Sequence, residues 1–330
     1  MRILFLITIL SIFLIANEIK PTLTIYTYDS FTSPWGPAPK IKQAFEKDNN
    51  CTLKFIGISS SIGALRKIQL EGKKTKADIL LGLDTSIAEV AKDTNLFIEH
   101  TLNITNLNLP IKYEDNIFVP FDYSYFAFVY NENNLKNIPH SFEDLINMPK
   151  NFKIVIQDPR SSTAGLGLLL WIKSIYGENA SNYWKQLSPY ILTITKGWSE
   201  SYGLFLKGEA DMVLSYTTSP AYHIIEENLT NIKASSFKNG HYGKIEVAAI
   251  LKSSKQKVLA KKFLSFMHTK TFADIIPTSN WVYPVTNISN ELKNPFKNLY
   301  KPSHMILTNG KIVQQNRKDI INEWLNAIQK

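Results

Sequence analysis

The sequence predicts an α/β protein of two lobes with a doubly wound parallel sheet, and three observations lead to this prediction. First, strand-like and helix-like segments alternate from residue 23 onward, the pattern of a sheet with helices on both faces. Second, 330 residues suffice for two domains and a sizeable core. Third, no low-complexity tract or Pro/Gly/Ser-rich linker interrupts the chain, so extended crossing segments are expected to join the lobes.

The N-terminal segment is typical of a secretory signal peptide. Arg2 is followed by an apolar run over residues 3–16, in which only Thr8 and Ser11 are polar. The run is shorter than the about 20 residues of a membrane-spanning helix, but it matches the apolar region of a signal peptide. We therefore predict a signal peptide over residues 1–16 that is removed on export. The alternative is that this segment is retained as an N-terminal anchor.

The first third of the chain alternates between strands and helices. Alternating apolar residues, turn formers after strands, and serine or proline at helix starts mark the boundaries. The expected elements are a strand over 23–28, a helix over 37–48, a strand over 52–58, a helix that is capped by 59–61 and ends at 72, a strand over 77–83 and a helix over 86–94. The strand over 77–83 is almost wholly apolar, which predicts burial on both faces.

A long apolar and aromatic stretch over 118–130 separates this unit from a second one. It is long enough to be a strand that passes from one lobe into the other. The elements expected after it are strands over 153–156, 212–216 and 245–251, and helices over 164–176, 182–187, 199–207, 218–227, 258–268 and 313–329. We expect residues 22–122 with about 250–285 to form lobe 1, and residues 123–249 with about 286–330 to form lobe 2.

Composition and residue spacing argue against several functional classes. The net charge is +9, from 37 Lys and Arg against 28 Asp and Glu, but no long basic run with interleaved aromatics indicates nucleic-acid binding. Cys51 is the only cysteine, so an intrachain disulfide and a thiolate zinc cluster are excluded, and the six histidines lack metal-ligand spacing. No Gly-x-Ser-x-Gly nucleophile motif is present. These observations favour a binding protein over an enzyme.

Aromatic side chains stand at the ends of the expected elements. They are Tyr28, Trp35, Trp198, Tyr216, Tyr222 and Trp281. Ligands of open α/β sheets bind at the carboxyl ends of the strands, so these side chains are expected to face a cleft between the lobes. Aromatic faces from both lobes suit a flat or cationic ligand. The alternative is that they only fasten the lobes together. Trp171, by contrast, lies in an apolar helix and is expected in the core.

Two hydroxyl clusters, at 59–61 and 161–163, stand where helices are expected to begin. Hydroxyl groups, free backbone N–H groups and the helix dipole together make an anion site. We therefore add Ser60, Ser161 and Ser162 to the candidate site; the alternative is plain N-capping. Asp29, Asp84 and Asp122 could act as acids or bases, yet each also fits a turn or a cap.

Several segments resemble the thiamine-binding subunit of bacterial ABC importers. They are residues 26–31, 77–84, 118–123, 157–160, 165–171, 196–200, 214–223 and 276–281, and the match runs in order from about Leu23 to Pro284. The resemblance implies a periplasmic binding protein of the type II fold, whose hinge-linked lobes close on a ligand in the cleft between them. It implies a transport function without catalytic residues, metal or cofactor.

The resemblance also implies the ligand, the partners and the location. The ligand is thiamine or its mono- and diphosphate, and the partner is a membrane permease with its ATPase. The protein is expected to be a periplasmic monomer. By position, the six aromatic residues would line the ligand site, Asp29 would face the thiazolium cation, and the hydroxyl clusters would meet the hydroxyethyl end or its phosphate.

Two other hypotheses about the function remain open from the sequence. A receptor for another cation on the same fold would need several carboxylates for a polyamine, or clustered Tyr, His and Asp ligands for ferric ion. An enzyme that cleaves thiamine or hydrolyses its phosphate would need a nucleophile in the cleft, whereas Cys51 belongs to the strand that is expected near residues 52–58.

Overall fold

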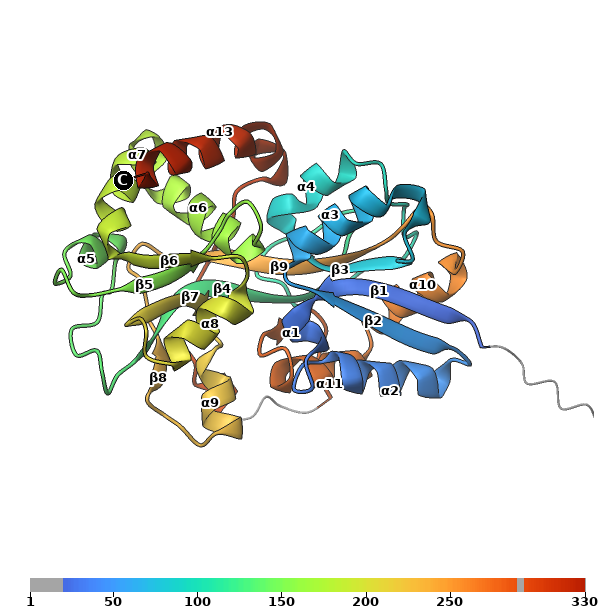
Figure 1. Cartoon of the computed structure of the whole chain (residues 1–330). Helices are drawn as coiled ribbons and strands as arrows, with labels where there is room; N and C mark the ends of the chain where they lie inside the picture. The colour runs from blue at the N-terminus through green and yellow to red at the C-terminus, as the bar shows by residue number, and fades with distance from the viewer. Residues whose placement is uncertain (1–19, 290–293, 330) are drawn as a thin grey trace, which may run out of the picture.

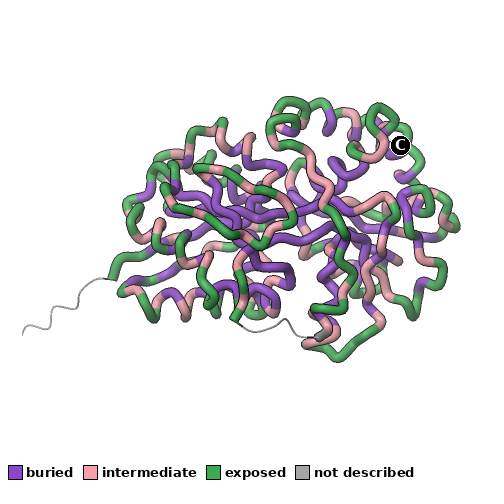
Figure 2. The backbone as a smooth tube through the Cα atoms, turned by 180° about the vertical axis from the view of Figure 1, so that it is seen from behind, coloured by how far each residue is buried: buried purple, intermediate pink, exposed green. Residues whose placement is uncertain are grey.

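The protein has two parts that lie side by side in the structure, a computed structural model that describes residues 20–289 and 294–329 (Figure 1). The predicted signal peptide over residues 1–16 lies outside the described residues. Buried backbone runs through the centre of both parts, with exposed segments around it (Figure 2). Within the described ranges, no helix combines the length and the apolar character needed to cross a membrane.

One sheet runs through both parts, with the strand order β2-β1-β3-β9-β4-β7-β5-β6. Lobe 1 holds β1 (Thr22–Tyr28), β2 (Thr52–Ile58) and β3 (Ile79–Asp84), and lobe 2 holds β5 (Ile154–Gln157), β6 (Ile191–Thr195) and β7 (Met212–Tyr216). In lobe 1, β1 pairs in parallel with β2 and β3; in lobe 2, β5 pairs in parallel with β6 and β7. Residues that follow these parallel strands therefore gather at one edge of the sheet in each lobe.

Two long strands connect the lobes. β4 (Val119–Asn131) and β9 (His241–Ile250) pair with each other in antiparallel register. β4 also pairs with β7 through residues 126–130, and β9 pairs with β3 through residues 246–250. The long stretch over 118–130 thus crosses between lobes, as its sequence predicts. The exact lobe boundaries stay a prediction.

Helices cover both faces of the sheet (Figure 1). In lobe 1 they are α2 (Ala38–Asp48), α10 (Lys257–Phe266) and α11 (Lys270–Ile275) on one face, and α3 (Ser61–Glu71) and α4 (Thr85–Lys92) on the other. In lobe 2 they are α5 (Phe142–Ile146), α6 (Thr163–Tyr176), α7 (Ala180–Leu187) and α13 (Gly310–Ile328) on one face, and α8 (Trp198–Leu206) and α9 (Pro220–Glu226) on the other. The remaining short elements are α1 (Asp29–Thr32), α12 (Asn294–Lys297), β8 (Ile232–Ala234), β10 (Tyr283–Pro284), β11 (Met305–Ile306) and four 3₁₀ turns over 72–74, 177–179, 188–190 and 276–278.

Side-chain alternation divides the core between the two faces of the sheet. β3 contributes Leu80 to the cluster beneath α3 and α4, and Leu81 to the cluster that includes Phe45 of α2 and Phe263 of α10. All residues of β3 are buried, which confirms the prediction from its apolar composition. Trp171 is also fully buried and packs on Phe142, so its predicted core role is confirmed.

Several elements are not evident from the sequence pattern, and β6 is the most important of them. β6 is the edge strand of lobe 2 and pairs only with β5, so most of its side chains are partly or fully exposed and its apolar signal is weak. The strand expected from residue 245 begins at His241, because polar residues at its start are buried by neighbouring strands. Helices α1, α5 and α11 have six residues or fewer, too few for a clear helical period.

The C-terminal helix α13 contacts both lobes. At its start, the side chain of Gln314 donates to Asp93, which follows α4 of lobe 1. Further along, Glu323 forms an ion pair of 2.9 Å with Lys173 of α6, and the ring of Trp324 packs edge-on against Trp184 of α7. Helix α13 therefore bridges the two lobes in addition to β4 and β9.

We expect Gly167→Ala to destabilise the protein by about 1–3 kcal/mol through overpacking. A Cβ at Gly167 of α6 would lie 2.2 Å from the buried ring of Phe126 in β4. Gly203→Ala in α8 is the matched control, because its Cβ would meet nothing within 4 Å and alanine favours a helix. Urea unfolding followed by circular dichroism measures both changes. Equal unfolding midpoints for the two variants would contradict the packing argument.

Candidate functional site

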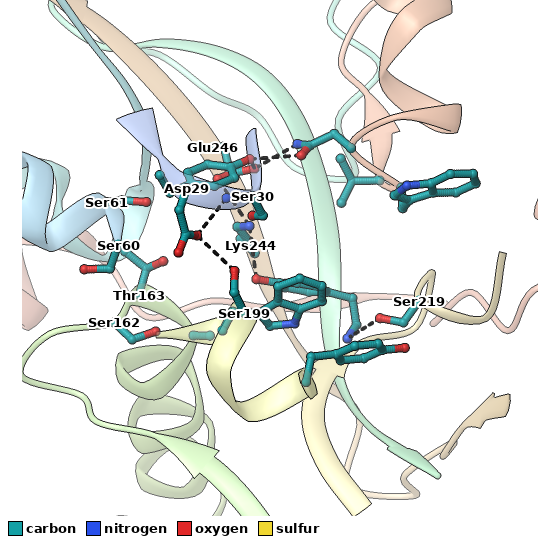
Figure 3. Close-up of a pocket in the computed structure, with 18 of the residues that line it drawn as sticks. Asp29, Ser30, Ser60, Ser61, Ser162, Thr163, Ser199, Ser219, Lys244 and Glu246 are labelled. Carbon is teal, nitrogen blue, oxygen red and sulfur yellow. Dashed lines mark hydrogen bonds and ion pairs between the residues drawn. The ribbon is translucent and has the colours of Figure 1, made fainter. Parts of the chain in front are cut away.

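A cavity of about 280 Å³ lies between the lobes, where the ends of β1 and β7 meet the first turns of α3, α6 and α8 (Figure 3). Its lining includes nine of the ten residues selected from the sequence: Tyr28, Asp29, Trp35, Ser60, Ser162, Trp198, Tyr216, Tyr222 and Trp281. Ser161 is not part of the lining, because its Oγ donates to the backbone oxygen of Lys196 at 2.9 Å. That these residues contact a ligand stays a prediction.

Trp198 forms one wall of the cavity. Its ring stacks on Tyr202, one helical turn later in α8, with a centroid distance of 4.7 Å and an interplanar angle of 23°. Its Nε1 donates to Ser215 Oγ at 2.8 Å, and that oxygen lies 2.8 Å from Ser219 Oγ. These contacts hold the indole in one orientation, so it can offer a rigid stacking surface.

Three further rings from both lobes form a second aromatic wall. The ring centroid of Tyr222 in α9 lies 5.3 Å from that of Trp281 and 6.4 Å from that of Trp35. Trp281 has a φ of 59°, which is rare for a bulky residue and persists where the surrounding structure imposes it. Trp35 is 47% exposed and so lies at the mouth of the cavity. These rings line the cavity and also join the lobes.

The hydroxyl clusters lie together at the opposite end of the cavity, at the amino ends of α3 and α6 (Figure 3). Ser60 Oγ accepts from the Gly63 N–H at 3.0 Å and donates to the backbone oxygen of Ser161 at 2.5 Å. Ser162 Oγ accepts from the Gly165 N–H at 3.5 Å. Both serines therefore cap their helices. The first turns of two helices still direct N–H groups and positive dipole ends toward this part of the cavity.

Asp29 occupies the middle of the cavity, between the aromatic and hydroxyl ends. Its Oδ1 accepts from the Ser30 N–H at 2.7 Å and from Ser199 Oγ of α8 at 2.9 Å. The second of these bonds crosses from lobe 1 to lobe 2. A carboxylate is thus held where it can face a cation while it also ties the lobes together.

The lobes touch at two further points beside the cavity. The Ser60–Ser161 bond is one of them, and the approach of Gly197 to Ser59 is the other. A Cβ at Gly197 would lie only 2.5 Å from the Ser59 backbone oxygen. Contacts this close belong to a closed arrangement of the lobes.

The floor of the cavity carries two charged residues that are not among those predicted from the sequence. Lys244 and Glu246 of β9 line the cavity and form an ion pair of 3.2 Å. Asn280 also lines it and accepts from the hydroxyl of Tyr28 at 3.1 Å, while Glu246 accepts from the same hydroxyl at 3.0 Å. Lys244 and Glu246 are two residues apart in an apolar strand, so they share one face of the sheet. This spacing is the sequence pattern from which they could have been identified.

Burial shifts the pKa values of several groups in the floor of the cavity and beneath it. Burial raises the pKa of Asp84 to about 6, against the opposing effect of its bond with Ser86. Burial also raises the pKa of the Tyr28 hydroxyl, and the charge of Glu246 raises it further. The pKa of Lys244 is raised although burial opposes this, because Glu246 stabilises the ammonium. The floor is therefore a low-dielectric region that holds several ionisable groups.

No metal cluster is formed by the described part of the chain. Across residues 20–289 and 294–329, no three His, Cys, Asp or Glu side chains are arranged to hold a metal ion. Cys51 is buried, and burial raises the pKa of its thiol. It is not among the residues that line the cavity.

Comparison with known proteins relates this architecture to a family. The family model described as bacterial extracellular solute-binding protein matches residues 29–271. The thiamine-binding periplasmic protein of Escherichia coli (strain K12) is 48% identical, over 94% of each chain. The protein of the same name from Brucella suis biovar 1 is 47% identical, over 94% of this chain and 93% of the relative.

A solved structure agrees with these relatives. The structure titled "Periplasmic thiamin binding protein" superposes with a TM-score of 0.92 at 48% identity, and it covers 95% of this chain and 98% of its own. The sequence prediction of a two-lobed periplasmic binding protein fold of type II is confirmed. The chain therefore belongs to the bacterial extracellular solute-binding proteins.

Proposed function

We propose that this protein binds thiamine in the periplasm and delivers it to the permease of an ABC importer. The observation that carries the proposal is the cavity, in which aromatic rings of both lobes surround a carboxylate. Thiamine has a flat aminopyrimidine ring and a permanently cationic thiazolium ring, which aromatic faces and a carboxylate recognise. Relatives that share about half of the sequence are named for the same ligand.

The cavity has two chemically different ends, and this difference supports one orientation of the ligand. The rings of thiamine would lie between Trp198 and the group formed by Trp35, Tyr222 and Trp281, with the thiazolium beside Asp29. The hydroxyethyl end would then point toward the hydroxyl clusters of α3 and α6. In this orientation each part of the ligand meets groups of matching polarity.

Thiamine mono- and diphosphate fit the same orientation. Their phosphate would lie at the amino ends of two helices, beside Ser60 and Ser162, where N–H groups and helix dipoles favour an anion. Binding there leaves the ring contacts unchanged, so one cavity can accept thiamine and its esters. We propose both as ligands.

This role implies how the protein is exported, in which oligomeric state it acts and which partners it meets. The protein would be exported by its N-terminal signal peptide, act as a monomer without cofactor or catalysis, and meet a permease that works with a separate ATPase. Aromatic rings that come from both lobes surround a ligand fully only when the lobes are closed, so ligand binding favours the closed state. The permease could then distinguish loaded from empty protein by the relation of the lobes.

Calorimetric titration of the protein without residues 1–16 tests the proposal. Thiamine, thiamine monophosphate and thiamine diphosphate are the ligands, and spermidine is the control cation without an aromatic ring. We expect one-to-one binding of thiamine with quenched tryptophan fluorescence. Binding of spermidine but not of thiamine would support the hypothesis of a polyamine receptor. Release of cleaved or dephosphorylated thiamine would support the hypothesis of an enzyme.

Loss of either tryptophan wall should weaken thiamine binding. Trp198→Ala and Trp281→Ala each remove a stacking surface, and we expect each to cost about 1–3 kcal/mol of binding free energy. Trp198→Phe is the matched control, because it keeps a ring on Tyr202 and should recover most of the affinity. Calorimetry gives the affinities and circular dichroism verifies the fold. Normal binding by both alanine variants would refute the aromatic walls.

Ser162→Ala should affect the phosphate esters more than free thiamine. The hydroxyl at the start of α6 faces the proposed phosphate position, and one lost hydrogen bond to a charged group is worth about 1.5–3 kcal/mol. Ser161→Ala should have a smaller effect, since that hydroxyl is bonded to Lys196. Thiamine serves as the internal control for each variant. Equal losses for thiamine and its monophosphate would remove the anion site.

Gly197→Ala should hinder closure of the lobes. Gly197 has an extended backbone with a φ of −151°, which any residue adopts, so the substitution alone does not strain lobe 2. The new Cβ would, however, meet the Ser59 backbone oxygen of lobe 1. We expect thiamine affinity to fall by a factor of about ten or more, while the unfolding midpoint stays unchanged. Unchanged affinity would show that closure tolerates a wider gap here.

A further inference from the structure

Three acidic residues lie side by side on neighbouring strands beneath the cavity. Asp84 of β3 is paired in register with Glu246 of β9, and Glu246 is paired in register with Asp122 of β4. All three are at most 2% exposed. Like charges directly opposite each other on paired strands repel, and burial strengthens the repulsion. The only cation that the described residues place in this group is Lys244.

The three carboxyl groups differ in the donors that surround them. Glu246 has Lys244 at 3.2 Å and accepts from the Tyr28 hydroxyl at 3.0 Å. Asp84 caps α4 and accepts from the backbone N–H of Ser86 at 2.9 Å and also from its hydroxyl. Donors of this kind stabilise a carboxylate, so these two groups are the ones suited to carry negative charge.

Asp122 has the least support for a negative charge. Its Oδ2 accepts from Asn280 Nδ2 at 2.6 Å, whereas its buried Oδ1 has no hydrogen-bond partner among the described residues. A buried carboxylate oxygen without a donor is costly, but a carboxylic acid can instead donate to a neighbouring carboxylate. Burial and then the charge of Glu246 raise the pKa of Asp122 well above its usual range.

We propose that Asp122 holds a proton when the cavity is empty and releases it when a cationic ligand binds. The proton leaves to solvent as the positive ligand enters, so the charge of the buried region does not change. Asp122 is not itself in contact with the cavity; it acts through Glu246 and Asn280, which are. It is therefore a specificity-determining residue for cations. The identity of the cation rests on the proposed function.

The ionisable groups around Asp122 and Glu246 fit this exchange. Burial is the main cause of the raised pKa of the hydroxyl groups of Tyr28 in β1 and Tyr216 in β7, and both stay neutral. Lys244 donates to Tyr216 at 3.1 Å and stays charged. The remaining neighbours are Glu246 and Asp84, and burial raises the pKa of Asp84 to about 6, so Asp84 also takes up a proton as the pH falls. A test must therefore separate Asp122 from Asp84.

The sign of the pH dependence follows from linkage. A nearby cation lowers the pKa of Asp122, so the complex binds fewer protons than the free protein. Thiamine affinity should therefore weaken as the pH falls, by up to about tenfold for each pH unit where one full proton is released. Calorimetry at one pH in two buffers of different ionisation enthalpy measures the number of protons released.

Two isosteric variants identify the group. Asp122→Asn mimics the protonated acid and keeps an acceptor for Asn280, so it should bind thiamine without proton release and with a flat pH profile. Asp84→Asn is the matched control; it keeps a capping side chain for α4 and should release protons as the unmodified protein does. Proton release that is lost in Asp84→Asn and kept in Asp122→Asn would overturn the proposal.

A neutral ligand gives a test that needs no variant. The thiazolone analogue of thiamine has no ring cation, and it should bind without releasing a proton. Equal proton release with the analogue and with thiamine would overturn the proposal. Thiamine binding without any proton release between pH 5 and 8 would also overturn it and leave the proposed function standing. No thiamine binding by folded protein would instead contradict the proposed function itself.

Discussion

Strands β4 and β9 pair in antiparallel register across the middle of the sheet, and both lobes are built outward from this pair. β3 adds to β9 on one side and β7 adds to β4 on the other, so the parallel strands of each lobe are placed by the same two crossings. The floor of the cavity includes Lys244 and Glu246 of β9. A change in the relation of the lobes must therefore be accommodated close to the charged residues Lys244 and Glu246.

The cavity combines two ways of placing functional groups. Aromatic rings come from the ends of strands, the starts of helices and irregular segments, where side chains can be large and partly exposed. The hydroxyl end comes from the first turns of two helices, where the backbone itself supplies donors. A ligand with a flat cationic part and a polar or anionic tail matches both. Neither lobe alone supplies the full set, which links recognition to closure.

Much of this arrangement could be predicted from the sequence, because periodicity locates the ends of strands and the fold places those ends together. Tyr28, Asp29 and Tyr216 were found in this way, and all three line the cavity. The orientation of Ser161 could not be predicted, since neighbouring hydroxyls at a helix start point in different directions. Lys244 and Glu246 were missed because a charged pair in a strand is usually assigned to a solvated face, and only the tertiary pairing of β9 buries it. The edge strand β6 was missed for the opposite reason, because its exposed side weakens the apolar pattern.

Helix α13 rests on α4 of lobe 1 and on α6 and α7 of lobe 2, so it is a second connection besides the crossing strands. A rotation that separates the lobes must shift α13 against at least one of its supports, unless the rotation axis passes through the helix. The contacts of Glu323 and Trp324 are buried or partly buried, whereas the contact of Gln314 is exposed. Movement of α13 against lobe 1 at Gln314 therefore costs less free energy than movement against lobe 2 at Glu323 and Trp324. The C-terminal segment, far in sequence from every residue that lines the cavity, thereby helps to set the energy difference between an open and a closed molecule.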